Sequence, residues 1–505
     1  MNNGEKTLKN DRGESNSYNL EHLFNPRSVA VIGASSGFGK WGQMVLSNII
    51  GGGFKGKIFP VNPKEKVICG LKTYMNIKDV PCDVDLAFIT TPVKTVSHVL
   101  ESCAEKGVKG AVIITSGFSE TDEAGKNLEK TIVSMCREKN LPFIGPNTMG
   151  IICPYSNLFA TGTHTRPKKG TVAFVSQSGN LGNQLIYWAE QQGIGISLFV
   201  GSGNNAMLTS IDYMEYLEND NHTNIIILYI ESIQDGRKYL ETAKRLNKKK
   251  PVIVLKGGHT EAGAAAAASH TGALSGESSI VEAAFRQAGL LSVTIPSELL
   301  DLSAGFSSLP IPKGNRVGIV TLGGGWGVVT SDECNKKGLV LPDIPEKIIE
   351  NISKYLPPFW SKRNPVDLVG TRDLEIPIVA VEELLKWEGI DAVISLGIVG
   401  RLELIRSLIR STRQVDPSMP AAFLDKMDEF SLEYEKKYIV SMVELMEKYE
   451  KPVVGVSLTS TAEGTVRSVS GKKYSGVFYQ TPENAVNVLS RMVAYQNFIK
   501  SISSN

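Results

Sequence analysis

Residues 28–42 read SVAVIGASSGFGKWG, which is a short apolar strand, a glycine-rich turn and the start of a helix in direct succession. The same order returns at residues 171–183, TVAFVSQSGNLGN, and at residues 316–329, RVGIVTLGGGWGVV. A pattern that recurs at three distant places indicates repeated units of one architecture. Each stretch is therefore predicted to open its own domain.

Short apolar runs follow these openings and alternate with segments of helical periodicity. They occupy residues 86–90, 111–115, 224–230, 252–255 and 392–396. Because the runs lack alternating polar residues, they are typical of parallel strands covered by helices on both faces. The sequence predicts an α/β fold of three consecutive doubly wound domains.

The length of 505 residues is too great for one hydrophobic core and allows roughly two to four domains. Residues 307–315, SSLPIPKGN, are rich in turn-forming residues and mark one boundary. The predicted divisions are a polar tail at 1–20 and domains at 21–160, 161–311 and 312–505.

Composition argues against several classes of protein. A formal charge of +2 disfavours broad electrostatic binding of nucleic acid, so small molecules and proteins are the expected partners. The six cysteines form no CxxC pair, which fits a reducing compartment and predicts no metal site. No apolar run approaches the ~18 residues of a spanning helix, and the polar N-terminus does not resemble a signal peptide. We expect a cytoplasmic protein without a membrane partner.

The glycine-rich turn of the first domain is expected to bind an anionic cofactor, since its amides lie at a helix N-terminus. Tight packing of strand against helix is the alternative explanation. The next strand, within residues 57–64, ends in Asn62, Pro63 and Lys64 instead of the acid that holds a ribose in dinucleotide sites. Lys64 favours phosphate over a ribose diol. Further strand ends expected at this carboxyl edge lie at Pro92, Thr115 and Ser116.

The corresponding turn of the second domain is a candidate phosphate site, because amides and hydroxyls at a helix N-terminus can hold a phosphoryl group. Its residues are Ser176, Ser178, Gly179, Asn180 and Leu181.

Residues 256–276, KGGHTEAGAAAAASHTGALSG, place His270 among alanine, serine, threonine and glycine. Such small neighbours leave an imidazole exposed and supply groups suited to an anion, so His270 is a candidate phosphorylated nucleophile. His259 is interpreted as a loop or cap residue near the site. Glu231 ends an apolar strand, where it either serves the site or merely caps a helix or pairs with Arg237.

In this order, VIGAS, VNPK, FITTP, IITSGF, GPNTMGI, VSQSGNLG and ASHTGALSG resemble the α subunit of NDP-forming acyl-CoA synthetases, with ADP-forming acetyl-CoA synthetase as the nearest type. The resemblance runs from about residue 25 to the C-terminus, and succinyl-CoA synthetase α is similar over the first two domains. It implies a Rossmann-like CoA-binding domain followed by two flavodoxin-like ligase domains.

The resemblance also implies roles for individual residues. His270 would carry the phosphoryl group and Glu231 would orient it. Ser116 departs from succinyl-CoA synthetase, which has a glutamate at that position. Trp326 departs from the GGPG-like loop that is usual in the family. Its side chain either changes the substrate pocket or the docking of the domain, or it is a packing residue. The implied CoA contacts are Gly33, Ser35, Ser36, Gly37, Gly39, Lys64, Pro92, Thr115 and Ser116.

The implied reaction joins acetate or another small carboxylate to coenzyme A at the expense of ATP, through a phosphohistidine and an acyl phosphate. The sequence has no GxxxxGK[ST] motif and no recognisable ATP-grasp half. ATP or ADP and Mg²⁺ are therefore expected on a separate ATP-grasp β subunit, in an α/β heterotetramer. The alternative is a CoA-binding or regulatory subunit without turnover, and Lys64 disfavours a third possibility, an NAD-dependent dehydrogenase.

Overall fold

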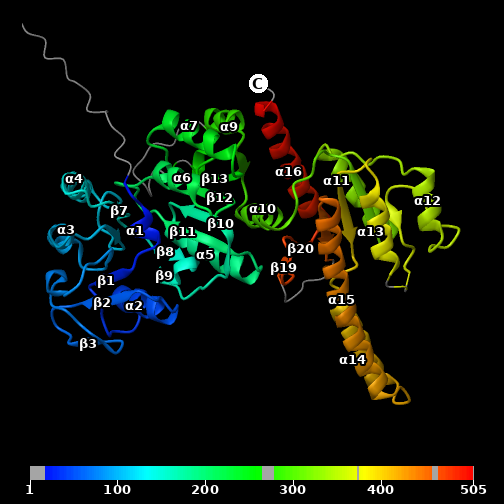
Figure 1. Ribbon diagram of the computed structural model, residues 1–505, viewed down its shortest axis with the longest axis horizontal. Coiled ribbons are helices and arrows are strands. Elements are labelled where there is room, and N and C mark those ends of the chain that lie inside the picture. The colour runs from blue at the N-terminus through cyan, green and yellow to red at the C-terminus, as the bar shows by residue number, and fades with distance from the viewer. Residues whose placement is uncertain are drawn as a thin grey trace, which may run out of the picture.

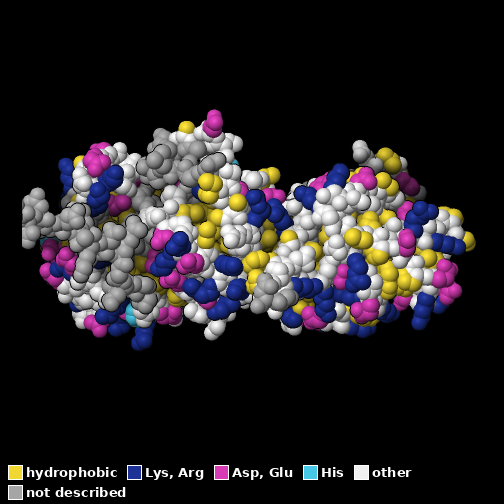
Figure 2. All heavy atoms as spheres, turned by 90° about the horizontal axis from the view of Figure 1, so that it is seen from above, with side chains coloured by type: hydrophobic (Ala, Val, Ile, Leu, Met, Phe, Trp, Pro, Cys, Tyr) yellow, Lys and Arg dark blue, Asp and Glu magenta, His cyan; other side chains and the backbone are white. Residues whose placement is uncertain are grey.

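Three sheets built mainly of parallel strands follow one another along the molecule in the computed structural model (Figure 1). The structure describes residues 18–263, 265, 278–371, 373, 375–457 and 464–503. Helices flank each sheet, so the prediction of three consecutive doubly wound α/β domains is confirmed. Basic and acidic side chains are interspersed over the face drawn in Figure 2. Among the described helices, none combines the length and apolar character needed to cross a membrane.

The first sheet has five parallel strands, and β1 is buried along its whole length. Their spatial order is β2 (Lys57–Val61), β1 (Ser28–Ile32), β5 (Leu86–Ile89), β6 (Gly110–Ile113) and β7 (Phe143–Ile144). The chain reverses its direction of winding between β1 and β5, and ligands bind such sheets at that point, beyond the carboxyl ends. The accompanying helices are α1 (Glu21–Phe24), α2 (Trp41–Gly51), α3 (Val93–Lys106) and α4 (Glu123–Glu138), with a 3₁₀ turn at Ile77–Asp79 and a small hairpin of β3 (Val67–Ile68) and β4 (Leu71–Lys72).

The second sheet has seven strands. Their order is β14 (Leu291–Val293), β13 (Val252–Lys256), β12 (Ile225–Ile230), β10 (Lys169–Ser176), β11 (Ile196–Gly201), β8 (Gly150–Cys153) and β9 (Leu158–Thr161). The last two are antiparallel, so a division near residue 160 falls within a strand of this sheet. Its helices are α5 (Gly179–Gln191), α6 (Ser210–Asn219), α7 (Gly236–Asn247), α9 (Ser278–Gln287) and α10 (Pro296–Ser308), with a 3₁₀ turn at Pro154–Ser156.

The third sheet has six strands and carries a long helical hairpin that projects away from it (Figure 1). The strand order is β16 (Val366–Asp367), β15 (Val317–Thr321), β17 (Ala392–Leu396), β18 (Val453–Val456), β20 (Ser475–Tyr479) and β19 (Val466–Ser468). Its helices are α11 (Gly324–Lys336), α12 (Glu346–Ser353), α13 (Ile376–Lys386), α14 (Leu402–Val415), α15 (Ala421–Tyr449) and α16 (Pro482–Ser503), of which α14 and α15 form the hairpin.

Helices α10 and α16 join the second and third domains. The rings of Phe306 and Tyr495 meet edge to face at 5.7 Å between centroids. At the same junction the Asn484 side chain donates a hydrogen bond of 2.8 Å to Asp301 Oδ2, and the Tyr479 hydroxyl donates one of 2.7 Å to the Asp301 carbonyl. Burial, reinforced by the Glu298 carboxylate, raises the pKa of Asp301 to about 6.

This junction makes stability depend on pH. Asp301 binds its proton more tightly in the folded protein than in the unfolded chain, so stability falls as the pH rises from about 4 to about 6. We expect Asp301→Asn to remove this part of the pH dependence and to stabilise the protein at pH 7.5 by about 2 kcal/mol. The new amide oxygen still accepts from Asn484. Thermal unfolding at pH 4.5 and 7.5 measures both effects, with exposed Asp343→Asn as control; an unchanged pH profile contradicts the prediction.

Candidate functional site

At two glycines of the glycine-rich segment after β1, close contacts leave no room for a side chain. A Cβ at Gly33, where φ is +90°, would lie 2.8 Å from the Thr90 hydroxyl oxygen. A Cβ at Gly42 would lie 2.0 Å from the Gly33 carbonyl oxygen. Gly39 also has a positive φ, of +80°, but faces open space. Tight packing thus explains Gly33 and Gly42, whereas Gly39 serves the conformation of the turn itself.

An acidic side chain lies against this turn. The Ser36 amide donates to both carboxylate oxygens of Glu65, at 3.3 Å each. These hydrogen bonds from Ser36 lower the pKa of Glu65, which is half-buried. Asn62 makes the contact possible, because its side chain donates to the Ala34 carbonyl at 2.7 Å and accepts from the Lys64 amide at 2.7 Å.

The sequence argument that the second strand ends without an acid is therefore incomplete. β2 ends at Val61, and Glu65 lies four positions beyond it, but the turn at Asn62 brings its carboxylate back to the glycine-rich turn. Lys64, between them, is exposed. The sequence did contain a signal for this contact: Glu65 follows three positions after Asn62, a residue type that favours turns.

The carboxyl ends of β5 and β6 lie beside the same turn. The Thr115 hydroxyl donates a hydrogen bond of 2.7 Å to the Thr91 carbonyl, and Pro92 is the N-terminal capping position of α3. The buried Thr91 hydroxyl has no hydrogen-bond partner within the described ranges. A buried hydroxyl without a partner is unusual and is a reason to look for a ligand at this strand end.

Ser116 is exposed. A carboxylate reaches this turn from Glu120, whose oxygens accept from the amides of Gly117 at 2.6 Å and Phe118 at 3.3 Å. Burial opposes ionisation of Glu120, but hydrogen bonds from the Asn204 side chain and these amides lower its pKa. The sequence reasoning missed Glu120.

Asn204, which follows β11, joins the first two domains. Its side-chain nitrogen donates to Glu120 Oε2 at 2.7 Å and to Glu129 Oε2 at 2.8 Å. Its side-chain oxygen accepts from the Asn147 side chain at 3.3 Å. One amide thus holds two carboxylates together at the interface.

The candidate phosphate site of the second domain is a tightly bonded turn. The Ser176 hydroxyl donates to the Ser178 carbonyl at 2.7 Å, and the Ser178 hydroxyl accepts from the Leu181 amide at 3.4 Å as the cap of α5. A Cβ at Gly179 would lie 2.2 Å from Met149 Cγ. Asn180 is exposed in the first turn of the helix.

Glu231 lies beside this turn. Gln177 brings them together, because its side-chain oxygen accepts from the amides of Glu231 and of Ser232, the latter at 3.0 Å. Glu231 is 8% exposed and accepts a hydrogen bond of 3.1 Å from the Tyr229 hydroxyl. The cap of the following helix α7 is Asp235, so capping that helix does not explain Glu231.

The segment that contains His270 begins next to Glu231. A Cβ at Gly257 would lie 2.9 Å from the Tyr229 hydroxyl oxygen and 3.4 Å from Glu231 Cγ, so only glycine allows this approach. Burial lowers the pKa of Lys256, and the Glu231 carboxylate opposes that shift. His270 itself lies outside the described residues. His259 lies in the loop after β13, with Nδ1 3.8 Å from Glu282 Oε1.

A cavity of about 310 Å³ opens at the carboxyl ends of β15 and β17 in the third domain. Trp326 lines it and is 45% exposed, so this side chain borders a pocket instead of filling the core. The other lining is mostly apolar or glycine, with Arg401 as its charged member.

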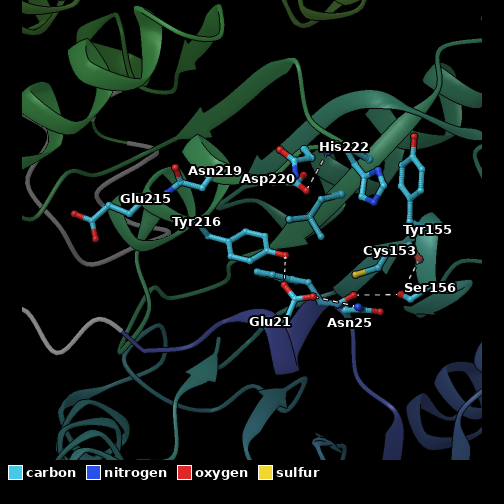
Figure 3. Close-up of a pocket in the computed structure, with 14 residues that line it drawn as sticks. Glu21, Asn25, Cys153, Tyr155, Ser156, Glu215, Tyr216, Asn219, Asp220 and His222 are labelled. Atoms are coloured by element: carbon cyan, nitrogen blue, oxygen red, sulfur yellow. Dashed lines mark hydrogen bonds between the residues drawn. The ribbon is translucent and has the colours of Figure 1, made fainter.

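A larger cavity, of about 580 Å³, lies away from these turns, between α1 and the C-terminal end of α6 (Figure 3). Its lining includes Glu21, which accepts a hydrogen bond of 3.2 Å from Tyr216, and His222, which stacks on Tyr155 at 3.7 Å between ring centroids. None of the predicted site residues lines it.

Comparison with known families places three matches along the chain. They are a CoA binding domain at residues 27–154, a succinyl-CoA ligase like flavodoxin domain at 169–306 and a ligase-CoA domain at 317–402.

Individual proteins match over most of the chain. An acetate–CoA ligase [ADP-forming] II subunit alpha of Pyrococcus furiosus is 44% identical over 413 residues, covering 80% of this chain and 89% of the relative. A 4-hydroxybutyrate–CoA ligase [ADP-forming] of Nitrosopumilus maritimus is 34% identical, covering 95% of this chain and 64% of the relative. The structure of a Ca. Korarchaeum cryptofilum dinucleotide forming acetyl-coenzyme A synthetase 1, in complex with phosphate and ADP, matches with a TM-score of 0.80 at 32% identity, covering 96% of this chain and 98% of that one.

Because Asn204 contacts two carboxylates, we expect stability to change strongly when its side-chain amide is replaced by a carboxylate. Asn204→Asp replaces the shared donor with a third carboxylate, and we expect it to lower the free energy of unfolding at pH 7 by about 2 kcal/mol. The loss should shrink at pH 5, because crowding favours the protonated form of one carboxyl. Thermal unfolding at the two pH values tests this, with Asn127→Asp, exposed on α4, as control. Equal stability of the two variants at pH 7 contradicts it.

Proposed function

This chain belongs to the α-subunit family of NDP-forming acyl-CoA synthetases, and we propose that it converts a small carboxylate, CoA and ATP into acyl-CoA, ADP and phosphate together with a separate ATP-grasp subunit. The family members are acid–thiol ligases. The observation that carries the proposal is the position of Glu231 beside the turn at 176–181, at the start of the segment that contains His270. These parts come from three separate strand ends.

The first domain supplies the binding site for CoA, which brings the reacting thiol. Residues at the carboxyl edge of its sheet fit such a ligand. In the turn through Ser35, Ser36 and Gly37, the Ser36 amide binds the Glu65 carboxylate and the Gly37 amide donates to the Ser35 hydroxyl, so an anion would bind the turn by replacing these acceptors. The buried hydroxyl of Thr91 lies at the neighbouring strand end. The residues proposed to contact CoA are Gly33, Ser35, Ser36, Gly37, Gly39, Lys64, Pro92, Thr115 and Ser116.

The turn through Ser176, Ser178, Gly179, Asn180 and Leu181 is proposed to hold phosphate. It opens α5, a helix of 13 residues whose N-terminal amides and dipole favour an anion. Ser176 and Ser178 use their hydroxyls to shape the turn, and Ser178 also binds the Leu181 amide, so the amides of Gly179 and Asn180 are the groups proposed to bind the phosphoryl oxygens.

His270 is proposed to carry the phosphoryl group. Its ring nitrogen takes the group from ATP and ADP leaves; the substrate carboxylate then takes the group as the phosphorus–nitrogen bond breaks. A thiol displaces phosphate from the resulting acyl phosphate and gives the thioester. Glu231 is suited to hold the imidazole by accepting its N–H, which leaves the other ring nitrogen free for phosphorus.

The nucleotide half of the reaction is assigned to the partner. The Pyrococcus furiosus relatives are named as alpha subunits, which implies a second chain. An ATP-grasp β subunit would bring ATP or ADP and Mg²⁺, and cytoplasmic localisation would suit both chains. The acid is proposed to be acetate or a similarly small molecule, since acetate is the substrate in the names of the Pyrococcus furiosus relatives.

Phosphorylation of His270 tests the proposal directly. We expect the chain, incubated with the partner subunit, acetyl-CoA, phosphate and Mg²⁺, to gain one acid-labile phosphate on the peptide that contains His270. His270→Ala should abolish the label, Glu231→Gln should slow its formation at least about ten-fold, and His259→Ala should keep it. Intact-mass spectrometry with peptide mapping measures all four proteins. A label on His259, or bound CoA without any label, would contradict the carrier role; the second result would indicate a CoA-binding subunit without turnover.

The contact of Glu65 with Ser36 makes a separate prediction for CoA binding. A carboxylate at the amide of a phosphate-binding turn competes with phosphate by charge and by position. Glu65→Gln should therefore tighten the binding of CoA about two- to five-fold at low salt, because a charge near the protein surface contributes little more. Isothermal titration measures the affinity, with Glu138→Gln on α4 as control. Weaker binding by Glu65→Gln would instead make the carboxylate a support for the turn.

A further inference from the structure

The last residue of β13, Lys256, is a buried lysine without a role in the transfer proposed for His270. Its side chain is 6% exposed, whereas lysine is rarely buried unless its charge is paired. Strand β13 runs parallel to β12, and Lys256 lies opposite Ile230, the residue before Glu231. Lys256 and Glu231 therefore belong to the same carboxyl edge of the second sheet.

The ammonium group of Lys256 has unused donors. It carries three N–H groups, but among the described residues Nζ donates one hydrogen bond, of 2.5 Å, to the carbonyl oxygen of the next residue, Gly257. That bond keeps the ammonium at the end of the strand. Because a buried charge that lacks acceptors is costly, this position is suited to an anionic acceptor from a ligand.

Glu231 acts on this ammonium without binding it. Burial lowers the pKa of Lys256, and the Glu231 carboxylate opposes that shift. The carboxylate accepts a hydrogen bond of 3.1 Å from the Tyr229 hydroxyl, whereas Lys256 donates to a backbone carbonyl. The two charges thus attract each other with no hydrogen bond between them, so the donors of Lys256 are left for another group.

The proposed reaction brings further negative charge to this edge. A phosphoryl group and the substrate carboxylate have to meet near Glu231, which is itself a carboxylate. A cation offsets the repulsion among them, most strongly where water is excluded. Among the described residues the buried cationic side chains are Lys256, Lys451 and Arg467, and only Lys256 belongs to the second domain.

We propose that Lys256 is a further catalytic residue, whose ammonium donates a hydrogen bond to an oxygen of the phosphoryl group while that group passes to the substrate carboxylate. The inference rests on the proposed function. In this step the phosphorus–nitrogen bond breaks, its electron pair stays on the nitrogen, and a bond forms between phosphorus and a carboxylate oxygen. Lys256 keeps its protons throughout and acts by its charge.

The rate of phosphorylation of the full chain, with the partner subunit, acetyl-CoA, phosphate and Mg²⁺, tests this role. Lys256→Met removes the charge with little change in side-chain length, and we expect it to slow labelling at least about a hundred-fold. Lys256→Arg keeps the charge and should be labelled at least about ten-fold faster than Lys256→Met. The control Lys244→Met, exposed on α7, should be labelled like the wild type. Rapid quenching followed by intact-mass spectrometry measures the four rates.

Thermal unfolding and CoA titration of the same proteins separate catalysis from a structural role. Replacing a buried, incompletely bonded charge with an apolar side chain should leave the unfolding temperature unchanged or raise it, and CoA affinity should not change. Labelling of Lys256→Met at the wild-type rate, or its loss together with stability or CoA binding, overturns the inference and leaves the proposed function standing. A wild type that is never labelled refutes the proposed function, and this inference with it.

Discussion

The side-chain amide of Gln177 joins the ends of β10 and β12, and the arrangement of this edge of the second sheet depends on it. Its oxygen accepts from the Glu231 and Ser232 amides, while its nitrogen donates to the Ser232 carbonyl at 3.1 Å. The Gln177 amide in turn donates to the Tyr229 carbonyl at 3.1 Å. Adjacent parallel strands share hydrogen bonds along their length, but their ends diverge into separate loops. Gln177 continues the pairing past the last residue of the strands and fixes Glu231 relative to α5.

Where two strand ends come closest to each other, a glycine makes the short distance possible. Gly257 allows the end of β13 to lie against Tyr229 and Glu231, and Gly33 does the same between β1 and Thr90. In both domains the functional edge is thus compact because a backbone without Cβ sits where two strand ends meet. Polar side chains then reach this edge from the loops: Glu65 and Glu120 in the first domain and Glu231 in the second.

Local signals in the sequence were sufficient for the fold. Each strand, turn and helix start is encoded within about fifteen consecutive residues, and the apolar runs predict parallel sheets; both predictions are confirmed. The attachment of β8 and β9 to the second sheet was not predicted, because pairing with β11 joins residues about fifty positions apart. Glu65 and Glu120 were missed for a similar reason, since each lies beyond its strand and is turned back by the loop.

The roles of the predicted site residues, His270 above all, stay predictions. Nor could the sequence show that the Lys256 side chain is buried with unused donors, because a lysine at a strand end is usually exposed.

A side chain that carries a phosphoryl group between two sites needs residues at each site that are already in position to bind it. If His270 carries phosphate between this chain and a partner, the energy of each transfer depends on how well its imidazole is oriented on arrival. The groups at the described strand ends are held by several hydrogen bonds each: Glu231 by Tyr229 and Gln177, and the turn at 176–181 by Ser176 and Ser178. Because folding already fixes these side chains, they lose little further conformational entropy when they bind the imidazole. In the proposed mechanism the imidazole comes from the small-residue segment at 256–276. Two successive glycines, Gly257 and Gly258, with φ of +78° at Gly258, separate that segment from β13. If His270 is the carrier, phosphoryl transfer thus depends both on well-ordered strand ends and on a carrier segment that is attached separately from them.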